Sequence, residues 1–269
     1  MNSPSSPTSA IVTVAFGFST EHLDYTFSSF ALNANVPLHA FVIGGALPKR
    51  RLENVTYHLV TPQNDFSHPL REVYFRRMEL LDTLNVDFAL VVDSYDVLCL
   101  RPLPAFGSLL AGGDVAACVE HMGARYLMGQ GYTPHFLNGG VFFWNVPRSQ
   151  DMRAEIVARG RRHFRTIADD QYAINEVIQS RYFERLRILP CQYNYRAYLN
   201  RRQRGWPTVT HLDGIFVYHN ATCMDEAKSL GPWKAKAELP PLPNDGGPLT
   251  PSQQFWRRVR LRLQPHVIK

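Results

Sequence analysis

Residues 88–100, with the sequence FALVVDSYDVLCL, decide the fold of this 269-residue chain. Residues 88–92 are apolar without interruption, which is typical of a strand buried on both faces of a sheet. Asp93 and Asp96 follow directly, and a second apolar run begins at Val97. Because ligands of open α/β sheets bind in the crevice at the carboxyl ends of the strands, the sequence predicts that both carboxylates face such a crevice.

The carboxylates of Asp93 and Asp96 repel each other at this spacing, and a divalent cation would relieve the repulsion. Oxygen ligands suit Mg²⁺ or Mn²⁺, and either ion can in turn hold a diphosphate. A simple turn is the alternative interpretation, since Asp and Ser are common turn residues. The sequence around this pair leaves both interpretations open.

Strand-like and helical segments alternate on either side of this segment. Such alternation predicts an α/β fold, with a Rossmann-like, mostly parallel central sheet flanked by helices. The expected strands are residues 10–18, 38–44, 55–60, 88–92, 97–100, 114–120, 136–144, 186–189 and 215–218. The expected helices are residues 21–35, 71–84, 147–163 and 170–181.

One domain is expected over residues 10–239, between a disordered N-terminus at residues 1–9 and a Pro-rich linker at residues 240–251. Residues 252–269 are expected to form a basic amphipathic helix with five basic and no acidic residues. The rest of the chain then holds 24 basic and 23 acidic side chains, a near-neutral body that argues against nucleic-acid binding. The tail pattern suits a helix lying on an anionic membrane surface, or a helix packed on the domain.

The four cysteines show no C-x-x-C pair, so reduced thiols are expected. The N-terminus lacks the basic region of a signal peptide, and the first apolar run is too short to span a bilayer. We therefore expect a cytoplasmic protein, with peripheral membrane association through the tail. The P-loop, G-x-G-x-x-G, H-E-x-x-H and G-x-S-x-G motifs are absent, which weakens kinase, dehydrogenase and hydrolase interpretations.

Three further segments carry candidate functional residues. Residues 136–140 (FLNGG) place two glycines inside a strong strand, which indicates either close approach to a ligand such as a sugar ring or a β-bulge. Residues 169–171 (DDQ) open a helix, where an Asp also serves as an N-cap. His219 ends an apolar run and could offer its imidazole to a metal, or be a structural histidine.

Taken in order, these motifs resemble the retaining, UDP-sugar-dependent glycosyltransferases with the GT-A fold. Glycogenin, the bacterial lipooligosaccharide galactosyltransferases and the glucosyltransferase domain of the collagen lysyl hydroxylases belong to this group. The resemblance covers residues 10–225 and rests on DSYD (93–96), FLNGG (136–140), DDQ (169–171) and VYHN (217–220). It implies a hexosyltransferase that moves glucose or galactose from a UDP-sugar to a hydroxyl of a glycan, lipid-linked or protein acceptor.

The resemblance also implies roles for individual residues. Asp93, Asp96 and His219 would bind Mn²⁺ or Mg²⁺. Asp170 and Gln171 would lie beside the anomeric carbon as the catalytic residues. The expected donor and nucleotide contacts are Ala15, Phe16, Gly17, Arg77, Tyr95 (against the uracil), Asn138, Gly139 and Gly140.

One position departs from the family pattern. Relatives place a Lys six residues after the metal-binding His, and this chain has Asp225 there. Lys228, or alternatively Lys234, would then hold the diphosphate. A catalytically inactive protein that binds a partner or a membrane remains an alternative, as does a sugar nucleotidyltransferase. The resemblance implies attack by the acceptor on the same face as the leaving group, because relatives mostly lack a well-placed nucleophile. Asp170 is the one candidate nucleophile for a double displacement.

Overall fold

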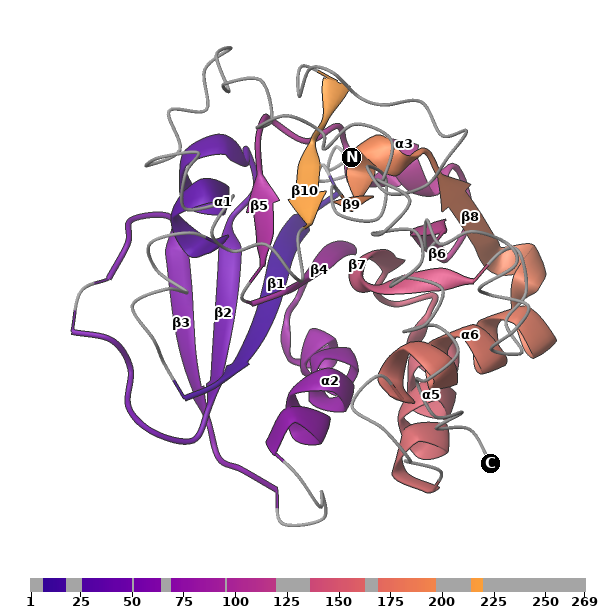
Figure 1. Ribbon diagram of the computed structural model, residues 1–269, viewed down its shortest axis with the longest axis horizontal. Coiled ribbons are helices and arrows are strands. Elements are labelled where there is room, and N and C mark those ends of the chain that lie inside the picture. Colours follow the sequence, from indigo (N-terminus) through magenta and orange to yellow (C-terminus); the bar gives the residue numbers. More distant parts are fainter. Residues whose placement is uncertain are drawn as a thin grey trace, which may run out of the picture.

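The computed structural model describes residues 7–17, 26–49, 51–63, 69–94, 96–119, 136–162, 169–196 and 214–219. The expected linker at residues 240–251 and the expected helix at residues 252–269 lie outside these ranges, as does most of the expected disordered N-terminus. Within them, a central sheet runs across the molecule from β3 to β8, with helices on both of its faces (Figure 1).

Seven strands form this sheet in the order β3-β2-β1-β4-β7-β6-β8. β3, β2, β1 and β4 are mutually parallel, β7 is antiparallel to both of its neighbours, and β6 and β8 are parallel. The predicted α/β fold with a mostly parallel sheet is confirmed. The strands are β1 (Ser9–Phe16), β2 (Leu38–Ile43), β3 (Val55–Val60), β4 (Phe88–Asp93), β6 (Val115–Val119), β7 (Leu137–Asn145) and β8 (Leu186–Leu189).

Each face of the sheet has its own apolar core, because alternate strand residues point to opposite faces. Helices α2 (Pro69–Glu79), α5 (Gln150–Arg162) and α6 (Asp169–Arg181) pack on one face, where Trp144 is fully buried. Helices α1 (Ser28–Asn33) and α3 (Phe106–Leu110) pack on the other. The short 3₁₀ helices are η2 (Leu80–Thr83), η3 (Phe183–Arg185) and η4 (Cys191–Tyr193).

The reversed direction of β7 has a direct consequence for the site. Its register with β4 pairs Val92 with Val141, so Gly140 and Asn138 at the start of β7 lie at the edge where β4 ends. Without that reversal these residues would lie at the opposite edge of the sheet.

A second sheet of three short strands, β5 (Val97–Cys99), β10 (Val217–His219) and β9 (Tyr195–Arg196), lies on the α1 and α3 side. The antiparallel register of β10 with β5 pairs His219 with Val97. The apolar character of residues 97–100 and 215–218 was expected, but their association into a sheet of their own was not.

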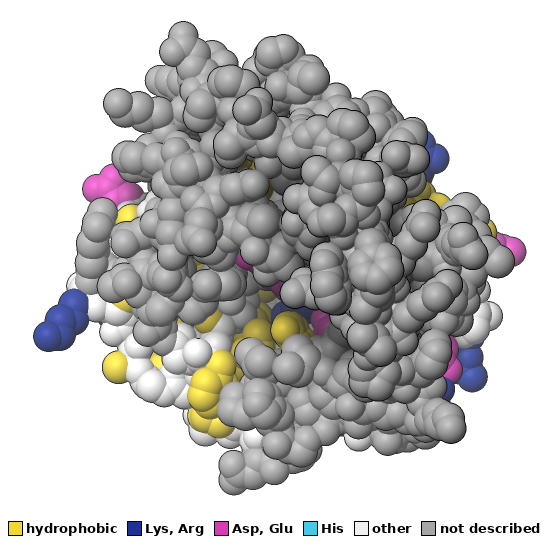
Figure 2. All heavy atoms as spheres, in the orientation of Figure 1, with side chains coloured by type: hydrophobic (Ala, Val, Ile, Leu, Met, Phe, Trp, Pro, Cys, Tyr) yellow, Lys and Arg dark blue, Asp and Glu magenta, His cyan; other side chains and the backbone are white. Residues whose placement is uncertain are grey.

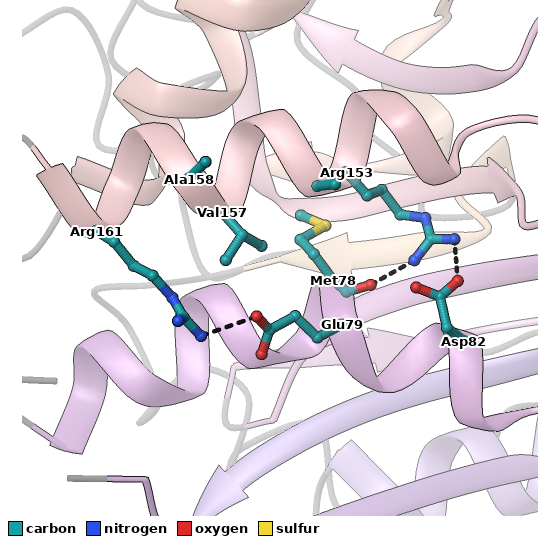
Figure 3. Close-up of a pocket in the computed structure, with 8 residues that line it drawn as sticks. Met78, Glu79, Asp82, Arg153, Val157, Ala158 and Arg161 are labelled. Atoms are coloured by element: carbon teal, nitrogen blue, oxygen red, sulfur yellow. Dashed lines mark hydrogen bonds and ion pairs between the residues drawn. The ribbon is translucent and has the colours of Figure 1, made fainter. Parts of the chain in front are cut away.

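Two arginines of α5 join it to α2 and to the following η2 (Figure 3). The guanidinium of Arg153, 1% exposed, pairs with Asp82 at 2.5 Å and donates to the carbonyls of Met78 and Val146. Arg161 and Glu79, both partly exposed, pair at 2.9 Å further along the two helices. Because an unpaired buried guanidinium is costly, the contacts of Arg153 hold α2 and η2 against α5.

Candidate active site

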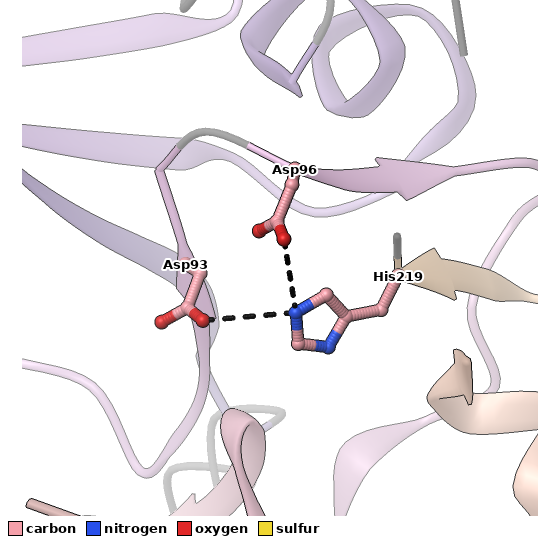
Figure 4. Close-up of side chains that lie close together, drawn as sticks. All are labelled: Asp93, Asp96 and His219. Atoms are coloured by element: carbon pink, nitrogen blue, oxygen red, sulfur yellow. Dashed lines mark ion pairs between the residues drawn. The ribbon is translucent and has the colours of Figure 1, made fainter. Parts of the chain in front are cut away.

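Three potential metal ligands meet at the carboxyl edge of β4. Asp93 is the last residue of β4, Asp96 follows three residues later, and His219 is the last residue of β10. Because His219 pairs with Val97, the imidazole lies next to Asp96. His219 Nε2 lies 3.5 Å from Asp96 Oδ2 and 3.8 Å from Asp93 Oδ2, and one ligand atom from each residue lies within 4.8 Å of the others (Figure 4).

This cluster fits a divalent cation. Two carboxylates and one imidazole converge, and carboxylate-rich donor sets suit Mg²⁺ or Mn²⁺. His219 is 2% and Asp96 9% exposed, whereas the Asp93 side chain is 30% exposed, so the cluster is open on one side. Three protein ligands leave coordination positions for oxygens from a bound molecule.

Arg77 ties this cluster to the start of α6. Its guanidinium, buried on α2, donates at 2.6 Å to Asp93 Oδ1, to Asp170 Oδ2 and to the carbonyl oxygen of Gly139. Burial opposes the charged form of Arg77, but the carboxylates of Asp93 and Asp170 outweigh it and raise the pKa of Arg77. Arg77 therefore stays cationic between two acidic candidate residues.

The two glycines of the FLNGG strand make room for side chains of the site. A Cβ on Gly140 would lie 2.3 Å from His219 Cε1 and 2.5 Å from Asp93 Oδ2. A Cβ on Gly139 would lie 3.1 Å from Gln171 Oε1 and 3.5 Å from Asp170 Oδ2. The neighbours of both glycines are thus side chains of the site, and those of Gly140 belong to the candidate metal cluster.

The other interpretation of these glycines, a strand irregularity, also holds. The register between β6 and β7 shifts between Ala117 and Val119, opposite residues 138–141 of β7. The irregular pairing of β6 with β7 and the close packing of the cluster thus occur at the same place.

Asp170 and Gln171 lie in the first turn of α6, beside Gly139. Gln171 Oε1 accepts a hydrogen bond of 2.9 Å from the backbone N–H of Gly139. Asp170 is 5% exposed and pairs with Arg77. The structure thus brings together both expected catalytic residues, Arg77 and the three expected metal ligands.

The end of β1 lies beside the same edge, because Val14 pairs with Asp93. Ala15 is buried, Phe16 is 43% exposed, and Gly17 has a φ of +69° that favours glycine. Phe16 is therefore partly exposed at the end of β1, with its ring beside Gly44 at the end of β2. In Figure 2, acidic and basic side chains are visible next to each other near the middle of the face.

Three expected residues, Tyr95, Lys228 and Lys234, lie outside the described part of the chain.

Two residues near the cluster were not expected from the sequence. Tyr74, on α2, lies under the Arg77 guanidinium at 5.7 Å, and burial together with the carboxylates of the site raises its pKa to about 12. Asn194 contacts His219. No local sequence pattern indicates that Tyr74 or Asn194 belongs to the site.

No protein-family model matches the sequence, and no curated protein matches it. Solved structures do match in fold. The galactosyltransferase LgtC, in complex with donor and acceptor sugar analogues, aligns with a TM-score of 0.55 and 16% identity over 79% of this chain and 87% of LgtC.

Two longer proteins show the same likeness. The glycosyltransferase GlyE of Streptococcus pneumoniae TIGR4 aligns with a TM-score of 0.55 and 16% identity over 80% of this chain. The bifunctional glycosyltransferase WbbM aligns with a TM-score of 0.54 and 13% identity over 82%. The chain spans 54% of the GlyE chain and 47% of the WbbM chain. It therefore has the GT-A fold of these glycosyltransferases.

Proposed function

We propose that the chain is a metal-dependent, retaining glycosyltransferase. It transfers a hexose, glucose or galactose, from a UDP-sugar to a hydroxyl of a glycan, lipid-linked or protein acceptor. The observation that carries the proposal is the convergence of Asp93, Asp96 and His219 at the carboxyl edge of the sheet, joined through Arg77 to Asp170. The proposal therefore rests on the chemistry of the site as well as on the fold, since a fold alone does not determine function.

In this proposal Asp93, Asp96 and His219 hold Mn²⁺ or Mg²⁺, which neutralises the negative charge that develops on the diphosphate leaving group. Lys228 or Lys234 supplies the second positive charge to that group. Arg77 fixes the carboxylate of Asp93 from the other side, at 2.6 Å, and so limits its rotation.

Phe16 and Tyr95 would contact the nucleotide, with Ala15 and Gly17 shaping the edge beside it. The ring of Phe16 is partly exposed, and in this proposal it packs against the nucleobase. Asn138, Gly139 and Gly140 would lie close to the donor sugar, next to Asp170 and Gln171.

Retention is proposed to follow from attack on the front face. The acceptor oxygen forms the new bond to the anomeric carbon as the sugar–phosphate bond breaks, and the departing phosphate takes the hydroxyl proton. Asp170 Oδ2 is paired with Arg77 at 2.6 Å, which makes that oxygen a poorer nucleophile than a free carboxylate. That pairing supports the front-face route over a double displacement.

Residues 252–269 carry a separate proposal, that a basic amphipathic helix binds an anionic membrane surface. Among the helices the structure describes, none has the length and apolar character needed to cross a bilayer. Removal of residues 252–269 should abolish sedimentation with anionic liposomes and leave donor hydrolysis unchanged. Unchanged sedimentation would reject this membrane role.

The activity is tested by incubating the protein with a panel of UDP-sugars and measuring UDP release. We expect release from UDP-glucose or UDP-galactose with Mn²⁺ and none in EDTA. Asp93→Asn should abolish release, whereas Asp87→Asn, at the opposite end of β4 and bonded to Thr8, should not. UDP binding without release from any sugar would instead favour a catalytically inactive protein.

A further inference from the structure

A chain of hydrogen bonds connects His219 to the start of β7. His219 Nδ1 lies 2.9 Å from Asn194 Oδ1, Asn194 Nδ2 donates to Asn138 Oδ1 at 2.8 Å, and the backbone N–H of Gly140 donates to the same oxygen at 3.0 Å. His219, Asn194 and Asn138 are 2%, 1% and 1% exposed. Bulk water therefore has little access to any of these side-chain contacts.

The direction of every bond in this chain follows from its far end. A backbone N–H can only donate, so the Asn138 atom that faces Gly140 is the amide oxygen. The Asn194 group opposite that oxygen must be its NH₂, which turns the Asn194 oxygen toward His219. An amide oxygen can only accept, so Nδ1 of His219 carries the proton.

The remaining ring nitrogen is then defined as well. In the neutral imidazole, a protonated Nδ1 leaves Nε2 with its lone pair, and Nε2 is the nitrogen that faces Asp93 and Asp96. A lone pair directed at two carboxylates is favourable when a cation lies between them. Histidine ligands of metals are commonly held in this way through their second nitrogen.

The fold places Asn194 for this contact. Asn194 follows η4, where its N–H bonds to the Cys191 carbonyl, and precedes β9, which pairs with β10 so that Arg196 lies opposite His219. Its side chain lies between β7 and β10, two strands of different sheets. Asn194 thus links the FLNGG strand to the candidate metal ligand.

We propose that Asn194 is a positioning residue, which holds His219 in the tautomer and ring orientation that present Nε2 to the metal, with Asn138 fixing the orientation of Asn194. This inference rests on the proposed function. It also gives Asn138 a role in the site that requires no contact with the sugar.

The test uses full-length protein labelled with ¹⁵N-histidine, at a pH where the His219 ring is neutral, and the His219 signals are assigned by their absence in His219→Gln. We expect metal-free wild type to show a protonated Nδ1 and an unprotonated Nε2. Asn194→Leu should lose this preference and bind Mn²⁺ about 10- to 100-fold more weakly, by calorimetry or by the electron paramagnetic resonance of free Mn²⁺.

Two further variants keep the test decisive. Asn194→Asp retains an acceptor for the Nδ1 proton, so it should keep the wild-type tautomer and bind Mn²⁺ more tightly than Asn194→Leu. Asn33→Leu removes a partly exposed asparagine whose side chain donates to the Cys99 carbonyl at 2.8 Å and not to His219, and it should leave Mn²⁺ affinity unchanged.

The outcomes separate this inference from the proposed function. A protonated Nε2 in the neutral wild-type ring, or wild-type Mn²⁺ affinity in Asn194→Leu, would overturn the role of Asn194 and leave the metal site standing. Failure of wild-type protein to bind Mn²⁺ would refute the metal site itself, and the tautomer measurement would still decide how His219 is held.

Discussion

Replacing Gly140 by Ala tests how tightly the candidate metal cluster is packed. The added Cβ would lie 2.3 Å from His219 Cε1 and 2.5 Å from Asp93 Oδ2, whereas ordinary contacts begin at 3.4 Å. Both side chains, or the β7 backbone, must therefore shift by about 1 Å, since small-to-large changes in packed regions force such shifts. His219 is held by Asn194 and Asp93 by Arg77, so either movement stretches a buried hydrogen bond.

We expect Gly140→Ala to lower the free energy of unfolding by about 1–3 kcal/mol, as overpacking usually does. Mn²⁺ affinity should fall about 10- to 100-fold, because a ligand is displaced from its position. Chemical denaturation and Mn²⁺ calorimetry measure the two effects separately.

Gly113→Ala is the matched control, because its Cβ would meet the carbonyls of Arg185 and Leu110 at 3.0 and 3.1 Å near the start of β6, at the opposite edge of the sheet. It should lose stability and keep its Mn²⁺ affinity. A folded Gly140→Ala protein that binds Mn²⁺ as tightly as wild type would refute the reasoning.

Three other predictions concern charge. Arg77→Met should destabilise the fold by about 3–5 kcal/mol, because it leaves the carboxylates of Asp93 and Asp170 without their buried cation, and should abolish UDP release; a stable, active variant would contradict this. Burial lowers the pKa of His39 and of His58, whose ring nitrogens lie 3.0 Å apart, so stability should fall as pH drops through about 6.5. Replacing both histidines by Gln should flatten that part of the stability curve, and an unchanged slope would be inconsistent with it. Mn²⁺ at 100 times its Kd should stabilise the protein by about 2.7 kcal/mol, and melting temperatures unchanged by EDTA would argue against a metal site.

The strand at β4 and the position of Asp93 were predictable because both follow from local pattern. An uninterrupted apolar run indicates a buried strand wherever it occurs, and the polar residues after it mark the end of that strand. The same holds for α2, α5 and α6, whose expected ranges overlap the observed ones. Helix α1 falls within the expected helix at residues 21–35, and the five-residue helix α3 was not expected.

Strand direction and long-range partners were not predictable in this way. The pattern of β7 is the same for a parallel and an antiparallel strand, yet its antiparallel direction is what brings Gly140 beside Asp93. Asn194 and His219 are 25 residues apart and meet only because β9 and β10 pair. The FLNGG motif could signal close approach, but the tertiary structure decides that the Gly140 neighbours are Asp93 and His219.

Calorimetric titration of UDP into the protein tests the central claim most directly, that Asp93, Asp96 and His219 hold a cation that binds a nucleoside diphosphate. With saturating Mn²⁺, wild-type protein should bind UDP, and in EDTA binding should be lost. The Asp93→Asn/Asp96→Asn double variant should bind UDP in neither condition, while Asp87→Asn should behave as wild type. Equal UDP affinity with and without Mn²⁺, or metal-dependent UDP binding by the double variant, would contradict the claim.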